Sequence, residues 1–265
     1  MTLNQTEKMN NKKVAIFGIH INALLMEEAV TLIKTWLNES SRDCRFVVTP
    51  NVDHIVKLNN NRLFKKAYEH ASLVIADGKP LVWASKLFGE AVDVTVPGSD
   101  LVPAIFDQYK KDNQPLKIFL LGAGSGVAEK AKLVIHDQWP LIKVIGTYSP
   151  DFGFESNQQE SNNICELINT SGADLLVIGL GAPKQELWVN AYAASLSVKV
   201  ALCVGATIDF IAGEKKRAPV FMQILCLEWA YRMMSEPKRL APRYFFDGLV
   251  FPWLLIKEWY LRRCK

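Results

Sequence analysis

The chain has 265 residues, 49% of them hydrophobic, and a net charge of +4, which fits one large core plus an appended segment. The apolar run from Gly248 to Ile256 is far shorter than the ~20 residues of a membrane-spanning helix, and Met1 to Lys13 lacks a signal peptide's apolar core. The five cysteines form no Cys-x-x-Cys pair, which favours reduced thiols without a zinc site. A cytoplasmic protein is expected.

The positive charge is concentrated near the C-terminus. From Glu214 onward, 11 Lys or Arg residues stand against 5 Asp or Glu, a net of +6, so the preceding body carries −2. Clustered cations among Trp and Tyr suit anionic headgroups or phosphates. The plainer interpretation is a basic, solvated pair of helices. A nucleic-acid partner is not expected, because the body is acidic and large apolar side chains interrupt the basic segment.

Short apolar segments alternate with segments of helical period along the body. The expected strands are Val14–Phe17, Phe46–Val48, Leu73–Ala76, Ile118–Leu121, Val144–Ile145, Leu175–Ile178 and Val200–Val204. The expected helices are Met26–Leu37, Asp53–Glu69, Leu81–Leu87, Asp100–Lys111, Val127–Trp139, Gln159–Asn169 and Lys184–Ser195. This alternation predicts an α/β fold with a Rossmann-like, mainly parallel sheet and helices on both faces in residues 1–213. Residues 214–265 would form a helical C-terminal appendage.

Polar residues and glycines follow four of the expected strands. They are Thr49-Pro50-Asn51, Asp77-Gly78, the segment from Gly122 to Gly126, and the segment from Gly179 to Glu186. In open parallel sheets, ligands bind at the carboxyl ends of the strands, where helix N-termini offer N–H groups to phosphate. The four segments together therefore predict a ligand site.

Two of these segments allow alternatives. Asp77 could cap the helix after Gly78, or it could act as a general base that emerges into a cleft. The turn with Gly122 and Gly124 resembles a dinucleotide fingerprint, although Val127 occupies the place of the third glycine. It favours either a tight turn without a ligand or an NAD-dependent oxidoreductase.

The segment after the Leu175–Ile178 strand is more specific. Gly179 and Gly181 permit close backbone approach, and Gln185 and Glu186 could bind a base, a ribose or a sugar hydroxyl. The four histidines are isolated and no Asp-x-Asp pair occurs, so no metal and no cofactor are expected. The charge of a nucleoside diphosphate leaving group would have to be met by helix N-termini and arginines.

The chain resembles the bacterial glycosyltransferases of the WecG/TagA/CpsF type, glycosyltransferase family 26, from the Val14 strand to about Tyr244. The resemblance is carried by Thr49-Pro50-Asn51, Ala76-Asp77-Gly78, Gly98-Ser99-Asp100, the segment from Gly179 to Trp188, and the segment from Arg217-Ala218-Pro219 to Arg243. It implies an inverting, metal-independent enzyme that transfers a hexose from a UDP-sugar to a polyprenyl-diphosphate-linked saccharide in cell-surface polysaccharide synthesis.

The resemblance also implies residue roles. Asp77 would be the base, and Thr49 and Asn51 would flank the reacting sugar. The substrate-binding candidates are Gly122, Gly124, Gly179, Gly181, Lys184, Gln185, Glu186, Arg217, Arg232, Arg239 and Arg243, the last three at the diphosphate. Thr95 stands where the family has an arginine, which leaves an N-acetylmannosamine-type sugar or glucose open as the donor.

The appendage is expected to place the enzyme on the inner face of the cell membrane, and a homo-oligomer remains open. Pro237 and Pro242 predict breaks that turn the arginines inward over the strand ends. The side chains then expected to face lipid are Phe221, Leu225, Trp229, Phe245, Phe251, Trp253 and Leu254. A non-catalytic membrane adaptor is the remaining alternative.

Overall fold

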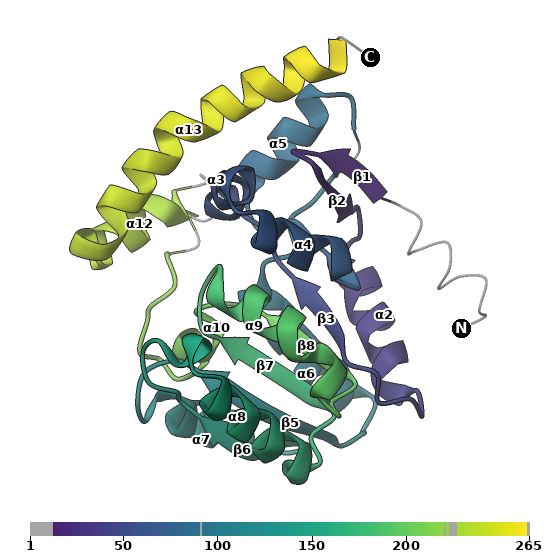
Figure 1. Cartoon of the computed structure of the whole chain (residues 1–265). Helices are drawn as coiled ribbons and strands as arrows, with labels where there is room; N and C mark the ends of the chain where they lie inside the picture. The colour runs from purple at the N-terminus through teal and green to yellow at the C-terminus, as the bar shows by residue number, and fades with distance from the viewer. Residues whose placement is uncertain (1–12, 91, 220, 223–226, 264–265) are drawn as a thin grey trace.

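The computed structural model describes residues 13–90, 92–219, 221–222 and 227–263. Its centre is a six-stranded, wholly parallel sheet with the order β4-β3-β8-β7-β5-β6 (Figure 1). The strands are β3 (Arg45–Val48), β4 (Leu73–Val74), β5 (Leu116–Gly122), β6 (Ile142–Tyr148), β7 (Leu175–Gly179) and β8 (Val200–Cys203). The predicted α/β fold with a mainly parallel sheet is confirmed, and six of the seven expected strands belong to this sheet.

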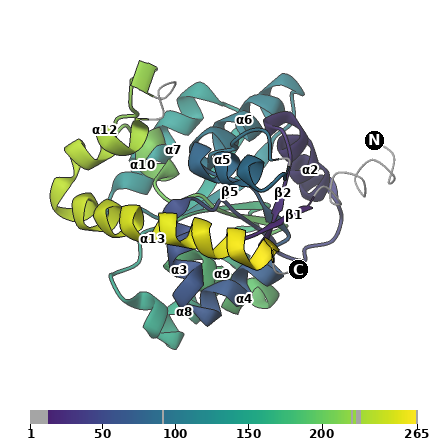
Figure 2. The same ribbon diagram turned by 90° about the horizontal axis from the view of Figure 1, so that it is seen from above.

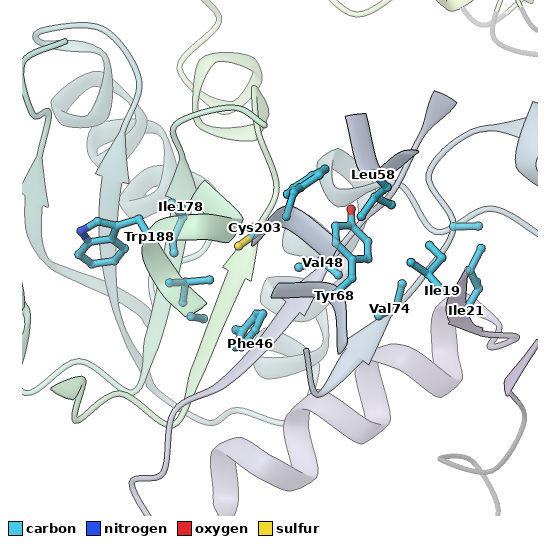
Figure 3. Close-up of a cluster of buried hydrophobic side chains, with 14 of the residues drawn as sticks. Ile19, Ile21, Phe46, Val48, Leu58, Tyr68, Val74, Ile178, Trp188 and Cys203 are labelled. Atoms are coloured by element: carbon cyan, nitrogen blue, oxygen red, sulfur yellow. The ribbon is translucent and has the colours of Figure 1, made fainter. Parts of the chain in front are cut away.

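Helices cover both faces of the sheet, because successive side chains of each strand point to opposite sides. Phe46 and Val48 of β3 belong to one buried cluster, whereas Val47 belongs to the other. Figure 3 shows part of the first cluster, in which Phe46 and Val48 lie near Tyr68 and Cys203. Strands buried on both faces in this way read as continuous apolar runs, which is how the sequence revealed them.

The helices divide between the two clusters. Those that contribute to the first are α3 (Val52–Asn60), α4 (Arg62–His70), α5 (Lys79–Leu87), α8 (Gln158–Ser171) and α9 (Lys184–Tyr192). Those that contribute to the second are α2 (Met26–Asn38), α6 (Gly98–Lys111), α7 (Val127–Gln138) and α10 (Thr207–Ile211). The short 3₁₀ helices η1 (Phe154–Ser156) and η2 (Ala193–Ser195) complete these layers.

The first expected strand is not part of the parallel sheet. β1 (Lys13–Ile16) pairs antiparallel with β2 (Ile19–Asn22) in a separate two-stranded sheet. Only Phe17 and Gly18 join them, both with positive φ, and such a short link permits only an antiparallel hairpin. The hairpin lies beside β4, where Asn22 Oδ1 accepts a hydrogen bond from the Val74 N–H at 3.0 Å. The expected strand is therefore present, but it lies outside the parallel sheet.

The helix expected from Asp53 to Glu69 is two helices, α3 and α4. Asn61 lies between them in an extended conformation, and its side chain accepts a hydrogen bond from the Phe64 N–H at 2.9 Å. Asparagine favours such caps over helix interiors because its amide competes with the backbone for hydrogen bonds.

The appendage, residues 214–265, contains α12 (Glu228–Ser235) and the 27-residue helix α13 (Pro237–Arg263). The break predicted at Pro237 is confirmed, but the one at Pro242 is not, because α13 runs through both Pro242 and Pro252. A proline inside a helix costs about 3 kcal/mol. Here packing outweighs that cost, since the buried residues Leu240, Asp247 and Leu254 recur at seven-residue intervals along one face.

The opposite face of α13 is apolar and exposed. Phe245, Leu249, Trp253 and Ile256 are all more than half exposed. Of the residues expected to face lipid, Phe221, Trp229, Phe245 and Trp253 are exposed, and Leu225 lies outside the described residues. The expectation was wrong for Leu254, which is buried, and for Phe251, which packs against the core. No helix in the described part of the chain is long and apolar enough to cross a membrane.

Candidate active site

A cavity of about 1250 Å³ lies at the carboxyl edge of the sheet, with the appendage closing one side. The strand ends and the following turns contribute Thr49, Asn51, Asp77, Gly124, Gly179, Gly181, Lys184 and Gln185, and the appendage contributes Arg217, Arg232, Arg239 and Arg243. Twelve of the fourteen candidate residues therefore meet in one cavity. Gly122 and Glu186 do not line it.

The strand order places the cavity at a topological switch point. The chain leaves β5 toward β6 and leaves β7 toward β8, in opposite directions across the sheet, and crevices of this kind are where α/β sheets bind ligands. Gly122 has a structural role, because a Cβ atom there would lie 2.7 Å from the Gly179 carbonyl oxygen. Its positive φ of 107° adds a second reason for glycine. Close packing of two strand ends thus explains the glycine in the fingerprint-like turn.

Asp77 lies three residues after the end of β4 and lines the cavity. The N-cap of α5 is Gly78, without a side-chain hydrogen bond, so Asp77 does not cap that helix. Burial raises the pKa of Asp77 from 3.8 to about 7, against the opposing effect of the Arg232 guanidinium. A carboxylate with a pKa near the operating pH suits proton transfer.

Thr49 and Asn51 flank the cavity on the β3 side. The Thr49 hydroxyl donates to the Cys203 carbonyl of β8 at 3.2 Å, which fixes the side chain between two strands. Asn51 caps α3, where its Oδ1 accepts a hydrogen bond from the His54 N–H at 3.4 Å. The amide nitrogen of Asn51 has two further donors for a ligand hydroxyl.

Gln185 lines the cavity and is oriented by Glu186, which does not line it. Gln185 Oε1 accepts from the Gly205 N–H at 3.2 Å, and its Nε2 donates to Glu186 Oε1 at 2.7 Å. Glu186 is fully buried, and burial raises its pKa to about 7. Glu186 therefore holds the Gln185 amide from behind, rather than presenting its own carboxylate to the cavity.

Lys184 and Arg217 each pair with an acidic side chain. Lys184 Nζ lies 2.7 Å from Glu155 Oε1 and 3.7 Å from the centre of the highly exposed Phe152 ring. Arg217 pairs with Asp100 of α6 and donates to the Ser99 hydroxyl at 3.0 Å. Arg217 thereby ties the start of the appendage to the body.

Arg232 and Arg239 are the arginines most directly disposed toward the cavity. Arg232 lies in the last turn of α12, with its guanidinium 5.8 Å from the centre of the Phe210 ring. Its charge lowers the pKa of Asp77, which places the two groups in electrostatic contact. Arg239 is half exposed and pairs with Glu236 at 2.6 Å. Both side chains line the cavity.

Arg243 is held differently, within a buried ion-pair network. Its Nε lies 3.1 Å from Asp53 Oδ1 and 3.7 Å from Asp247 Oδ2. Asp53 also receives a hydrogen bond of 2.7 Å from Lys57, whose ammonium reaches the Ala182 carbonyl at 3.0 Å. The network joins α3, the turn after β7 and α13. Arg243 therefore anchors the appendage as well as lining the cavity.

We expect Arg243→Ala to destabilise the folded protein by about 2–4 kcal/mol, because Asp53 and Asp247 would be left buried without their shared cation. The pKa of Asp247 is already raised to about 6 by burial and by Asp53. Thermal unfolding checks this, with Arg239→Ala as the matched control, since that exposed pair contributes at most about 1 kcal/mol. Equal melting temperatures for both variants would show that the network does not anchor α13.

Asp53 and Asp247 are the residues that sequence reasoning missed. Both are about 5% exposed and both line the cavity. Asp53 lies two residues after the Thr49-Pro50-Asn51 motif. Its ion-pair partner, Arg243, lies 190 positions further along the chain. A buried acid in a first helical turn is ambiguous in sequence, because such acids usually interact with the helix dipole. Within the described residues, no group of three or more His, Cys, Asp or Glu side chains could hold a metal ion.

Comparisons with known proteins agree with this geometry. The model of the glycosyl transferase WecG/TagA/CpsF family matches residues 14–265. Two relatives from Staphylococcus aureus, strains MRSA252 and MW2, are each 29% identical over 235 residues, which is 89% of this chain and 89% of each relative. Both are named N-acetylglucosaminyldiphosphoundecaprenol N-acetyl-beta-D-mannosaminyltransferase.

The family match covers the strand-end motifs and the appendage that together enclose the cavity. The match argues against both alternative interpretations of the sequence, an NAD-dependent oxidoreductase and a non-catalytic membrane adaptor. The chain is a glycosyltransferase that belongs to the WecG/TagA/CpsF family.

Proposed function

We propose that this enzyme transfers N-acetylmannosamine from a UDP-linked donor to N-acetylglucosaminyl-diphosphoundecaprenol, with inversion and without a metal ion. The names of the relatives support the sugar and the acceptor. The observation that carries the mechanism is Asp77, a carboxyl of pKa about 7 at the floor of a cavity that arginines enclose. The product is then a lipid-linked disaccharide of the kind used in cell-wall polymer synthesis.

In the proposed reaction, the acceptor hydroxyl gives its proton to the Asp77 carboxylate as its oxygen attacks the anomeric carbon. The bond from that carbon to the β-phosphate oxygen breaks, and UDP leaves. Attack opposite the leaving group inverts the anomeric centre, consistent with the beta linkage in the relatives' names when the donor is alpha-linked. Arg232 and Arg239 meet the charge that builds on the β-phosphate, a stabilisation of typically a few kcal/mol.

The same proposal places the donor along the carboxyl edge. Gln185 and the glycine turns after β5 and β7 contact the nucleotide, and Thr49 and Asn51 hold the sugar next to Asp77. Gly181 lines the cavity with a positive φ of 76° and open space at its Cβ position, so backbone can approach a ligand closely there.

The decisive experiment is turnover with a panel of UDP-sugars and a short-chain prenyl-diphosphate-linked N-acetylglucosamine, in buffer containing EDTA. The expected result is transfer from UDP-N-acetylmannosamine, with a beta linkage by proton NMR and no loss on chelation. Preferential transfer of glucose would contradict the proposal that UDP-N-acetylmannosamine is the donor. Retention of configuration would overturn direct displacement, and loss of activity in EDTA would overturn the metal-free mechanism.

We further propose that the exposed face of α13 lies on the cytoplasmic surface of the membrane. Leu249→Asp with Trp253→Asp should reduce binding to anionic phosphatidylglycerol vesicles at least tenfold, because two large apolar side chains lose their burial in the interface. Turnover on the soluble short-chain acceptor should remain. Leu133→Asp on α7, an equally exposed leucine, is the matched control. Unchanged sedimentation with vesicles in the double variant would contradict the docking face.

A further inference from the structure

A second, smaller cavity adjoins the active site. It has a volume of about 310 Å³ and lies between α5 and the segment 93–95. Lys79, Trp83 and Thr95 line both this cavity and the main one, so the two are direct neighbours. Lys86 and Asp93 complete its charged lining. None of the roles assigned above uses this space.

The side chains of α5 form an ordered series leading away from the general base. Lys79 is two residues after Asp77, Trp83 is one helical turn beyond, and Lys86 is almost one turn beyond that. At 1.5 Å rise per residue, Lys86 lies about 10 Å along the helix from Lys79. The Trp83 and Leu87 side chains, on the same part of the helix, are more than half exposed.

The outer end of α5 meets the appendage. The Arg262 guanidinium of α13 lies 5.2 Å from the centre of the Phe88 ring, which ends α5, and it pairs with Glu90 at 3.0 Å. Seen from above in Figure 2, α13 passes over the body with α5 to one side and with α3 and α4 to the other. The outer end of α5 therefore lies beside the C-terminal end of α13.

The proposed reaction brings two diphosphates to one carboxylate, one on the donor and one on the lipid-linked acceptor. Four appendage arginines line the main cavity, and three of them pair with acids: Arg217, Arg239 and Arg243. The second diphosphate needs cationic side chains of its own, because two diphosphates bound to the same arginines would repel each other. The α5 cavity offers such side chains, because its charged lining consists of two lysines, Lys79 and Lys86, and one acid, Asp93.

We propose that the α5 cavity binds the diphosphate of the acceptor, with Lys79 and Lys86 on the phosphates and the Trp83 ring against the adjoining sugar. The proposal rests on the proposed function for the identity of the acceptor. It assigns the two diphosphates to opposite sides of Asp77. Beyond Lys86, Leu87 would meet the first isoprene units on their way to the membrane.

The test measures donor and acceptor KM separately on the full-length enzyme, with farnesyl-diphosphate-linked N-acetylglucosamine as a soluble acceptor. Lys79→Gln and Lys86→Gln should each raise the acceptor KM about tenfold, the usual scale for one lost charged hydrogen bond. The donor KM should change less than twofold. Asp93→Asn should lower the acceptor KM, because it removes the one repelling charge. Lys111→Gln, at the far end of α6, is the control and should change neither value.

Direct binding separates this inference from the proposed function. Farnesyl diphosphate alone, titrated calorimetrically in the absence of donor, should bind the wild type and bind Lys86→Gln about tenfold more weakly, whatever sugar the enzyme transfers. Farnesyl monophosphate should bind less tightly than the diphosphate. Equal affinity of wild type and Lys86→Gln for farnesyl diphosphate would overturn the inference. So would loss of vesicle binding in Lys86→Gln with an unchanged acceptor KM, which would assign the lysine to lipid headgroups.

Discussion

Asp77→Asn should lower turnover by about 10²–10⁴-fold, the range that a positioned general base contributes. Asparagine keeps the shape and the hydrogen-bonding capacity of the side chain but cannot accept the hydroxyl proton. UDP should therefore bind the variant with near-normal affinity, measured by calorimetry. Near-normal turnover in Asp77→Asn would remove this residue from the mechanism, and failure to bind UDP would show that the substitution distorts the cavity.

The same variant should be more stable than the wild type above pH 7. Burial raises the pKa of Asp77 from 3.8 to about 7, so the folded protein holds this proton more tightly than the unfolded chain. The stability contribution of the group is therefore fully present below about pH 4 and falls as the pH rises to 7. Three pKa units correspond to at most about 4 kcal/mol. Thermal unfolding of both proteins at about pH 4 and about pH 8 should show a difference in stability that is large at the higher pH and nearly absent at the lower one.

Arg232→Ala and Arg239→Ala should each reduce turnover by about 10²-fold or more, because each removes a preorganised charge from the departing β-phosphate. Their folded stability should change little. Arg243→Ala should instead combine a loss of stability with its loss of rate, since its side chain pairs with Asp53. Thermal unfolding beside single-turnover rates separates these cases, and normal turnover in Arg232→Ala and Arg239→Ala would place the diphosphate elsewhere.

Arg232→Ala should also shift the pH profile. Arg232 is the strongest of the charges that lower the pKa of Asp77, so its removal should raise that pKa further. The acidic limb of kcat/KM, which reports the base in the free enzyme, should move to higher pH. Arg239→Ala is the comparison, because Arg239 is not among the charges that shift Asp77. If the pH profile of kcat/KM is unchanged in Arg232→Ala, the acidic limb reports the titration of a group other than Asp77.

Removal of residues 245–265 is a poor way to separate catalysis from membrane binding. Leu254 packs in the core, and Asp247 belongs to the Arg243 network. Truncation would therefore expose core side chains and free Arg243 at once. Point substitutions on the exposed face, at Leu249 and Trp253, leave both contacts intact.

The sheet and most of the site could be predicted because they depend on local patterns. β7 and β8 read as apolar runs since both faces of each strand are buried, and a parallel sheet then brings Asp77, Thr49 and Gln185 to a single edge. The spacing of these residues in sequence does not matter once the strands are parallel. Their convergence in one cavity follows from topology alone.

The remainder could not be predicted because it depends on pairings between distant segments. Nothing near Asp53 indicates that its partner is Arg243, and the continuity of α13 through Pro242 results from packing against α3 rather than from helix propensity. The β1–β2 hairpin was missed because Ile19–Asn22 is too short and too polar to stand out as a strand. In each case tertiary contacts overrode the local signal.

The length of α13 has a geometric consequence. The helix spans about 40 Å, is fixed near its start by the Arg243 network and near its end by Arg262, and carries its exposed apolar side chains between those two points. If that side rests on the bilayer, the two points at which α13 is held to the body fix the height of Asp77 above the lipid. That height then determines how far from the membrane an acceptor hydroxyl must lie to reach the carboxylate.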